Sequence, residues 1–177
     1  MCTIHHGATL FWHFSNYVPV RCRMTTIQSA YDRFGKVRFS PPSEGELFAL
    51  QRQIGVVLPP DYRQFILDFN GGYFSDPVIT PVGLGCPTEC LDSLFGIGAS
   101  HPSAELGRPA DIALFDENDP PKIIPIGNTA VGGLIILDTA PGDGNGSIFL
   151  KQAWGDFYYL TENLAEFFAL LREPTRR

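Results

Sequence analysis

The apolar residues of this chain fall at helical spacing in one short segment with marked ends, "LPPDYRQFILDFNGG". Its apolar positions recur three or four residues apart, which places them on one helix face: Tyr62, Phe65, Ile66 and Phe69. Pro59 and Pro60 suit the first turn, because proline has a helical φ and the N–H groups there have no helical partner. Asn70, Gly71 and Gly72 suit the end, because these residues adopt left-handed conformations at low cost. We therefore predict a compact helix followed by a sharp turn.

Two further amphipathic helices are predicted, one before this segment and one near the end of the chain. In "SPPSEGELFALQRQIG", Ser43 and Glu46 form a capping-box pair and Gly55 ends the helix. In "NLAEFFALLREP", Asn163 is the N-cap and Glu166 occupies the third helical position. The apolar residues of each helix lie on one face: Leu47, Phe48, Leu50 and Ile54 in the first, and Leu164, Phe167, Phe168, Leu170 and Leu171 in the second.

After the glycine pair the pattern changes to short β-rich runs separated by Gly, Pro and Asp: "VITPV", "LDSLFGI", "KIIPIGN", "GGLIILD", "SIFLK" and "DFYYL". The turn "PGDGNGS" contains Asp-Gly and Asn-Gly, so Leu134–Asp138 and Ser147–Lys151 are predicted to pair antiparallel. The segment "SAELGRPADIALFDENDPP" is predicted to hold a weak helix and an acidic loop, and residues 27–38 a short strand or an irregular arm. In the last strand, side chains alternate between the two faces, so only one of two sets can point into the core. One set is Phe157 and Tyr159, and the other is Trp154, Asp156 and Tyr158. We predict Phe157 and Tyr159 in the core.

This order of elements predicts an α+β fold: an antiparallel sheet of about five to six strands, with two N-terminal helices and one C-terminal helix packed against it. The domain is predicted over residues 40–172, between an N-terminal extension over residues 1–39 and a tail over residues 173–177. The first 23 residues show no sustained period and hold three of the four histidines. Our hypothesis is that Met24 is the initiator and that residues 1–23 are a translated upstream extension.

Composition narrows the class of protein. With 177 residues and 44% apolar content, the chain is long enough for one domain with a substantial core. No apolar run approaches the ~18 residues of a membrane span, and the N-terminus lacks the basic region of a signal peptide. We therefore expect a soluble cytoplasmic protein with reduced cysteines.

Charge is distributed unevenly along the chain, whose net charge is −6. Residues 41–171 hold seventeen Asp and Glu against five Lys and Arg, a net −12, whereas residues 1–40 carry +4 and residues 172–177 carry +2. An acidic body repels nucleic acid and anionic membranes and attracts basic partners. Solubility alone is an alternative explanation of the same charge.

No motif in the sequence indicates catalysis, a metal or a cofactor. Cys86 and Cys90 have a C-x₃-C spacing before His101, but structural zinc usually needs a second such pair. One turn has the oxygen spacing of a calcium loop, without the glycine and glutamate that such a loop requires: Asp143, Asn145 and Ser147. There is no G-x-S-x-G motif, and "GLGCPT" and "GIGASH" lack the lysine of a phosphate-binding loop. His101 has no acid nearby in sequence that would make it a general base.

The sequence resembles the SUKH superfamily, which joins bacterial immunity proteins with fungal regulators of cell-wall synthesis. The resemblance covers about residues 40–172 and rests first on "LPPDYRQFILDFNGG". It continues through "LFGIG", "IIPIGNTAVGGLIILD", "DFYYL" and "NLAEFFALL" in the expected order. A family member usually has aspartate after the glycine of the middle block, where this chain has Leu134. The motif positions are Leu58, Pro59, Asp61, Tyr62, Asn70, Gly71, Gly72, Gly127, Gly132 and Gly133.

The resemblance implies a protein without catalytic machinery that binds a toxin delivered by neighbouring cells and blocks it. Many such toxins are basic enzymes, and the acidic body of this chain would suit such a partner. The residues expected at the interface are aromatic or acidic: Tyr73, Phe74, Asp76, Glu89, Asp116, Glu117, Asp119, Trp154 and Asp156.

Two other function classes remain open on the sequence. One is a regulatory scaffold that binds a host protein or peptide, as the fungal members of the superfamily suggest. The other is a small hydrolase with an unrecognised site. Raised salt would weaken a complex between acidic and basic surfaces, and a hydrolase would show turnover that one point mutation abolishes.

Overall fold

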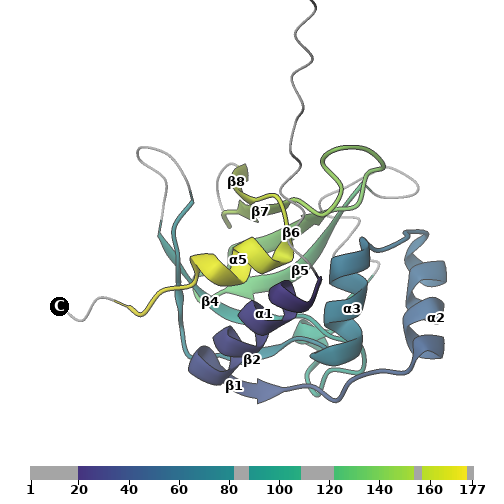
Figure 1. Ribbon diagram of the computed structural model, residues 1–177, viewed down its shortest axis with the longest axis horizontal. Coiled ribbons are helices and arrows are strands. Elements are labelled where there is room, and N and C mark those ends of the chain that lie inside the picture. Colours follow the sequence, from purple (N-terminus) through teal and green to yellow (C-terminus); the bar gives the residue numbers. More distant parts are fainter. Residues whose placement is uncertain (1–19, 82–87, 109–121, 154–156, 175–177) are drawn as a thin grey trace, which may run out of the picture.

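A computed structural model describes residues 20–81, 88–108, 122–153 and 157–174 of the chain (Figure 1). The helices of the described part are α1 (Val20–Phe34), α2 (Glu44–Ile54), α3 (Pro60–Asp68) and α5 (Leu164–Leu170), with a 3₁₀ turn, η1 (Pro102–Ala104). The strands are β1 (Gly35–Arg38), β2 (Gly72–Phe74), β3 (Val78–Ile79), β4 (Glu89–Leu94), β5 (Ile123–Thr129), β6 (Leu134–Asp138), β7 (Ile148–Lys151) and β8 (Phe157–Thr161). None of the helices in these ranges has the length and apolar character needed to cross a bilayer.

The strands pair antiparallel in the order β1-β2-β4-β5-β6-β7-β8, with β3 paired to β4 beside this path. The predicted hairpin is confirmed, since β6 and β7 pair from Leu134 opposite Lys151 to Leu137 opposite Ile148. The α+β class is confirmed as well, but the described sheet has eight strands rather than five to six. The additional strands β1 and β2 have four and three residues, too few for an alternating apolar pattern to identify them in the sequence.

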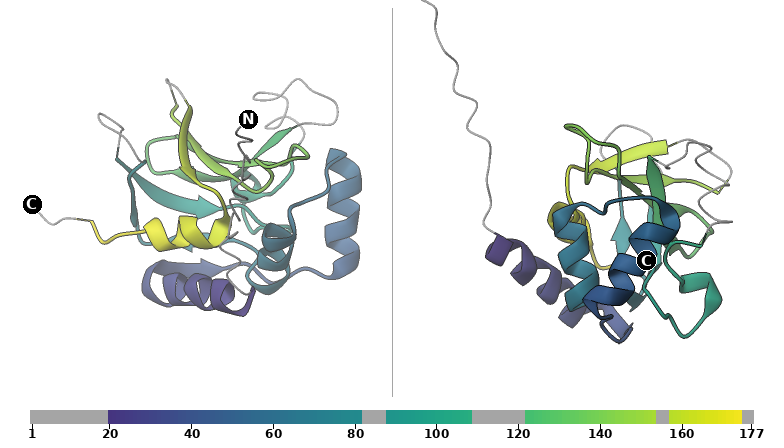
Figure 2. Two further views of the ribbon diagram at one scale, coloured as in Figure 1. Left: turned by 45° about the horizontal axis from the view of Figure 1, so that its top comes forward. Right: turned by 90° about the vertical axis from the view of Figure 1, so that its right-hand side faces the viewer.

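The helix α1 is the largest departure from the prediction. Residues 27–38, expected as a short strand or an irregular arm, are helical to Phe34 and only then enter β1. The buried residues of α1 recur at helical spacing: Ile27, Ala30, Tyr31 and Phe34. Figures 1 and 2 show α1 beside α5, against which it packs on one face of the sheet. The segment before residue 40 therefore contributes to the same core as the rest of the domain.

An aromatic cluster fills the space between these helices and the sheet. The Tyr31 ring stacks on Phe69 with 5.0 Å between centroids, and the Phe74 ring lies at the same distance on another side. Phe168 of α5 lies 5.7 Å from Tyr31 and 5.7 Å from Phe65. The core thus joins α1, α3, β2 and α5, and the apolar stripe predicted for α3 is buried in full.

The predicted helix ends are confirmed. The Ser43 side chain accepts a hydrogen bond from the Glu46 N–H, and the Glu46 carboxylate accepts one from the Ser43 N–H at 2.7 Å. Gly55 ends α2 in a left-handed conformation with a φ of 70°. At the start of α5, the Asn163 side chain accepts from the Glu166 N–H at 3.0 Å. These caps satisfy N–H groups that a helix start leaves without partners.

Asn70 turns the chain sharply from α3 into β2, as the Asn-Gly-Gly segment predicts. It is fully buried with a φ of 53°, and Gly71 has a φ of 73°. The Asn70 side-chain amide donates to the carbonyls of Ser40 (2.6 Å) and Ile97 (2.8 Å), and its oxygen accepts from the Ile97 N–H (2.8 Å). A Cβ at Gly71 would lie 2.4 Å from the carbonyl oxygen of Leu94, so the sharp turn requires glycine there. The Asn70 corner is therefore a joint between three segments.

The side-chain orientation of β8 is the reverse of the prediction. Phe157 and Tyr159, expected in the core, are 47% and 44% exposed. Leu160 is buried, and Tyr158 packs against the core. Because Tyr158 and Leu160 share one face of the strand, burial of the aliphatic Leu160 places the tyrosine inward with it. Trp154 and Asp156, which belong to the set opposite to Phe157 and Tyr159, lie outside the described residues.

We expect Asn70→Ala to lower the free energy of unfolding by about 3 kcal/mol, because it leaves three partly buried backbone groups of Ser40 and Ile97 without partners. Asn70→Gly removes the same hydrogen bonds but tolerates the left-handed backbone, so we expect it to be less destabilising by about 1 kcal/mol. Urea unfolding followed by circular dichroism measures both. An Asn70→Ala variant as stable as the parent would show that the joint does not hold the fold.

Candidate functional site

The residues predicted to contact a partner do not converge on one described surface. Five of them lie outside the described residues: Asp116, Glu117, Asp119, Trp154 and Asp156. Tyr73 is half-buried, edge-on to Phe39 at 5.4 Å, and Asp76 is exposed and lies 3.8 Å from the Lys36 ammonium. Phe74 is 1% exposed within the aromatic cluster, so this side chain belongs to the core and is not available to a partner.

Glu89 is also an internal residue and not an exposed acid. It is 6% exposed, and its carboxylate accepts hydrogen bonds from the Thr129 hydroxyl at 2.6 Å and the Gln152 amide at 3.4 Å. The Thr129 hydroxyl in turn accepts from the Gly133 N–H at 2.8 Å. A Cβ at Gly133 would lie 2.4 Å from Glu89 Oε2, so this glycine makes room for the carboxylate. Glu89 therefore joins β4 to the β5–β6 turn.

Two other motif glycines, Gly127 and Gly132, and His101 also have roles in holding the backbone. Gly132 has a φ of 86° in the β5–β6 turn, and a Cβ at Gly127 would lie 2.5 Å from the Ser93 carbonyl oxygen on β4. The His101 ring accepts a hydrogen bond from the Ser103 N–H at 3.2 Å and caps η1. This bond places the histidine at a turn, where its ring stabilises the local backbone.

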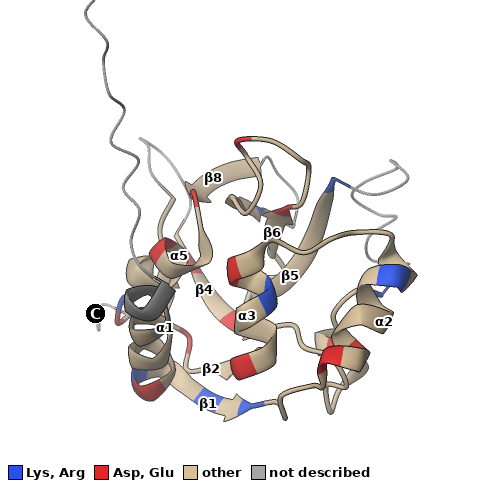
Figure 3. Cartoon of the chain, turned by 45° about the vertical axis from the view of Figure 1, so that its right-hand side comes forward, with Lys and Arg blue, Asp and Glu red and all other residues tan. Residues whose placement is uncertain are grey.

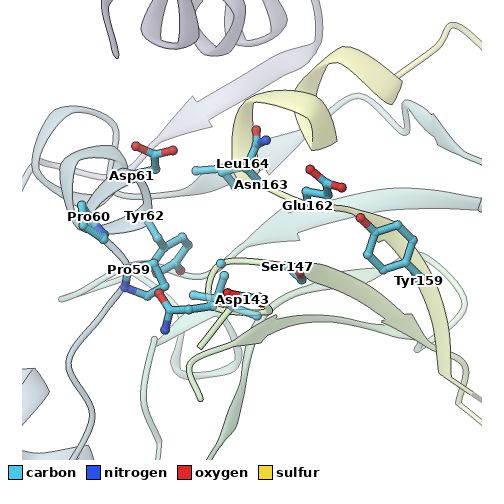
Figure 4. A pocket seen from close by; sticks show the side chains of 13 residues that line it. Pro59, Pro60, Asp61, Tyr62, Asp143, Ser147, Tyr159, Glu162, Asn163 and Leu164 are labelled. Atoms are coloured by element: carbon cyan, nitrogen blue, oxygen red, sulfur yellow. The ribbon is translucent and has the colours of Figure 1, made fainter. Parts of the chain in front are cut away.

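A cavity of about 710 Å³ opens where three segments distant in sequence meet (Figure 4). Its walls are the start of α3, the β6–β7 turn and the junction between β8 and α5. The lining contains three carboxyl side chains and no Lys or Arg, so we call it the acidic cleft. It is lined by Pro59, Pro60, Asp61, Tyr62, Leu137, Asp143, Asn145, Gly146, Ser147, Tyr159, Glu162, Asn163 and Leu164.

The β6–β7 wall is held by Asp138 at the end of β6. The Asp138 carboxylate accepts from the Ala140 N–H at 2.8 Å, and the Asp138 carbonyl accepts from the Gly146 N–H at 2.9 Å. Gly142 and Gly146 have φ values of 129° and 97°, which allow the chain to fold back tightly. The turn therefore presents Asp143 on a backbone that is fixed by its own hydrogen bonds.

The two remaining walls are positioned by helix starts. Pro59 precedes α3 and Pro60 begins it, while the Leu58 N–H donates to the Gln51 side chain at 2.8 Å and ties this link to α2. On the opposite side Asn163 caps α5, and the Thr161 hydroxyl donates to the Asn163 carbonyl at 3.0 Å. Each wall is thus fixed locally, and the cleft results from the way the core brings the three walls together.

Two carboxylates of the acidic cleft lack a neutralising partner. Asp143 and Glu162 are exposed, and neither forms a hydrogen bond or ion pair with another described side chain. Four ion pairs of the described part lie away from these two carboxylates: Arg33–Glu173, Lys36–Asp76, Arg38–Asp32 and Arg63–Glu44. Figure 3 shows the basic residues on β1. The cleft therefore keeps a negative potential that attracts cations.

Tyr159 lies at the mouth of the cleft within this potential. Its ring packs edge-on against Phe149 with 5.6 Å between centroids, and its hydroxyl points toward Glu162 (Figure 4). Partial burial raises the pKa of Tyr159, and the carboxylates of Glu162 and Glu166 raise it further because they repel a phenolate. The phenol is therefore neutral at physiological pH and offers both a donor and an acceptor.

Tyr62 contributes a polar atom at the floor of the cleft. Its ring points from α3 toward Asp143 and Ser147 in Figure 4, and it is 1% exposed. Its hydroxyl has no hydrogen-bond partner in the described structure, and burial raises its pKa well above the usual value. Most buried polar side chains have a partner, so this hydroxyl is a hydrogen-bonding group that the protein alone does not satisfy.

The cleft does not have the geometry of a metal centre. Across the described ranges, no three His, Cys, Asp or Glu side chains lie close enough together to hold one ion. Cys90 is a half-buried free thiol, and Cys86 lies outside those ranges. Separated carboxylates, an aromatic ring and polar turn residues suit a positively charged organic group instead.

The sequence does not predict the acidic cleft. In the sequence Asp61 is a motif position of the family resemblance, Asp143 belongs to a turn, and Tyr159 is predicted in the core. The one local signal was the oxygen-rich spacing around Asp143, which was considered for calcium and in fact faces the cleft. No sequence pattern relates the three walls, because only the tertiary fold brings them together.

Comparison with known proteins gives two findings. The profile of the SMI1 / KNR4 family (SUKH-1) matches residues 41–170 of the chain. A protein of Bacillus subtilis (strain 168), described as the SPbeta prophage-derived uncharacterized protein YokK, is 27% identical to this chain over 151 residues. That similarity covers 73% of this chain and 74% of the Bacillus protein.

We expect Glu162→Gln to lower the pKa of Tyr159, because it removes a negative charge that opposes ionisation of the phenol. The ¹³Cζ resonance of Tyr159, followed by NMR as the pH is raised, measures this pKa. Glu173→Gln is the matched control, since Glu173 pairs with Arg33 and should leave the Tyr159 pKa unchanged. An unchanged Tyr159 pKa in Glu162→Gln would show that the Glu162 carboxylate does not act on the Tyr159 phenol.

Proposed function

The chain belongs to the SMI1 / KNR4 (SUKH-1) family, and we propose that it is an immunity protein that binds and neutralises a cognate bacterial toxin. The proposed mechanism is occlusion without catalysis: the protein covers a basic surface of the toxin, and no covalent bond is made or broken. Immunity to toxins is what the SUKH resemblance implies for bacterial members. The Bacillus relative is described as prophage-derived, which is compatible with a role in competition between cells.

The observation that carries this proposal is the acidic cleft with its unpaired carboxylates. Residues 41–171 carry a net charge of −12, and of the acids in this range Asp76 pairs with Lys36 of β1. Asp143 and Glu162 have no such partner among the described side chains. A basic toxin surface would supply the missing positive charge, and the field would speed its association.

The absence of a catalytic role is part of the proposal. The His101 ring caps η1, and the Glu89 carboxylate is satisfied inside the sheet, so both residues have structural partners. The cleft offers acceptors for cations and a neutral phenol. These groups bind a partner by charge and shape.

Co-expression of the full chain with the protein encoded by the neighbouring gene tests the proposal. We expect a stoichiometric complex and loss of the toxicity of that protein. Affinity should fall as salt is raised from about 50 to 300 mM, because the Debye length shrinks. Failure to form a complex, or a complex that leaves toxicity intact, would reject the immunity role.

We expect the double charge reversal Asp143→Lys and Glu162→Lys to weaken this complex about tenfold or more, because two attractive charges become repulsive. The matched control is the pair Asp68→Lys and Glu173→Lys, which changes the net charge equally. Asp68 lies at the C-terminal end of α3 and Glu173 lies beyond α5, both away from the cleft. Calorimetric titration compares the two variants, and equal losses would show that net charge alone attracts the partner.

A further inference from the structure

We propose that the acidic cleft binds an arginine side chain of its protein partner, with the guanidinium between Asp143 and Glu162 and against the Tyr159 ring. This inference rests on the proposed function, because it names the group of the toxin that is recognised. It goes further in assigning one residue type to one cavity.

The first support is the set of unsatisfied groups that face the cavity. The Asp143 and Glu162 carboxylates on opposite walls are without ion pairs in the described part of the chain. Independently of these acids, the Tyr62 hydroxyl at the floor is buried and has no partner. A ligand that enters from the open side can donate hydrogen bonds to the two exposed carboxylates, and it reaches the Tyr62 hydroxyl only if the side chains that cover this group move apart. A hydroxyl without a hydrogen-bond partner and two carboxylates without ion-pair partners together indicate a cation that carries several hydrogen-bond donors.

The second support is the separation of the acceptors. They do not converge on a point as the ligands of a metal ion do. A guanidinium is planar and carries five N–H donors that point in different directions, so it can reach acceptors on several walls. The ammonium of lysine is a compact charge with three donors and cannot span them in the same way. The distribution of acceptors therefore favours arginine over a metal ion and over lysine.

The third support is the aromatic surface at the entrance. The Tyr159 ring is 44% exposed and is held edge-on against Phe149 at 5.6 Å. An arginine plane can stack on an exposed aromatic ring, a contact in which arginine is more frequent than lysine. The cavity of about 710 Å³ lies within the range of small-molecule sites, so it can admit a complete side chain.

The inference can be tested without the toxin by using capped amino acids as probes. The full chain labelled with ¹⁵N is titrated with N-acetyl-arginine methylamide, with the lysine analogue of equal charge, and with the neutral citrulline analogue. We expect the arginine probe to shift the backbone amide signals of Gly146 and Ser147. We also expect it to bind about fivefold more tightly than the lysine probe, and the citrulline probe to bind weakest.

Variants then locate the site of binding. We expect Asp143→Asn with Glu162→Gln to weaken the arginine probe about fivefold or more, and the control pair Asp68→Asn with Glu173→Gln to change it less than about twofold. Tyr62→Phe should remain folded, because it removes a buried hydroxyl without a partner, and it should weaken the arginine probe about threefold. Thermal unfolding of each variant confirms that the fold is intact.

The outcomes separate this inference from the proposed function. Equal binding of the arginine and lysine probes, or equal losses in the cleft and control variants, would overturn the arginine site even if the toxin complex forms. Arginine binding with the expected pattern would support the site even if the neighbouring protein is not neutralised. A toxin complex that the arginine probe displaces from the parent would support both.

Discussion

The side-chain amide of Asn70 is the interaction on which the arrangement of the fold depends. Its hydrogen bonds join the end of α3 to Ser40, before α2, and to Ile97, after β4. The left-handed backbone at Asn70 and Gly71 then sets the direction in which the chain enters β2. Because α3 has nine residues and is about 13 Å long, holding one end also fixes Pro60 at the other, where the acidic cleft begins.

Features with a local cause could be predicted from the sequence, and features set by distant contacts could not. The end of α3 and the β6–β7 hairpin were predicted because proline, glycine and asparagine determine the backbone where they stand. α1 was missed although its buried residues have helical spacing, because its start carries no marked cap. The orientation of β8 depends on which side of the strand faces the helices, and Leu160 was the better indicator than the aromatic residues beside it. The acidic cleft was beyond local analysis, since its walls come from three distant segments.

The arrangement of charge differs from what the composition alone suggests. Three basic residues of the first forty positions have structural partners, because Arg33, Lys36 and Arg38 each pair with an acid near β1. Arg38 also lies over the Tyr31 ring at 4.8 Å and the Phe69 ring at 5.3 Å, so it covers the aromatic cluster. Internal pairing thus neutralises acids near β1, whereas Asp143 and Glu162 of the cleft have no such partner among the described side chains.

The two ends of the sheet differ in a way that bears on how molecules meet in a concentrated solution. All four residues of β1 are exposed, and they include Lys36 and Arg38. Charges of this kind on a terminal strand oppose edge-to-edge aggregation, since an added strand would have to bury them. β8, at the other end of the described sheet, carries no charged side chain and exposes Phe157 and Tyr159. One edge of the protein is thus protected against accidental strand addition, and the aromatic edge is where crowding would first bring chains together.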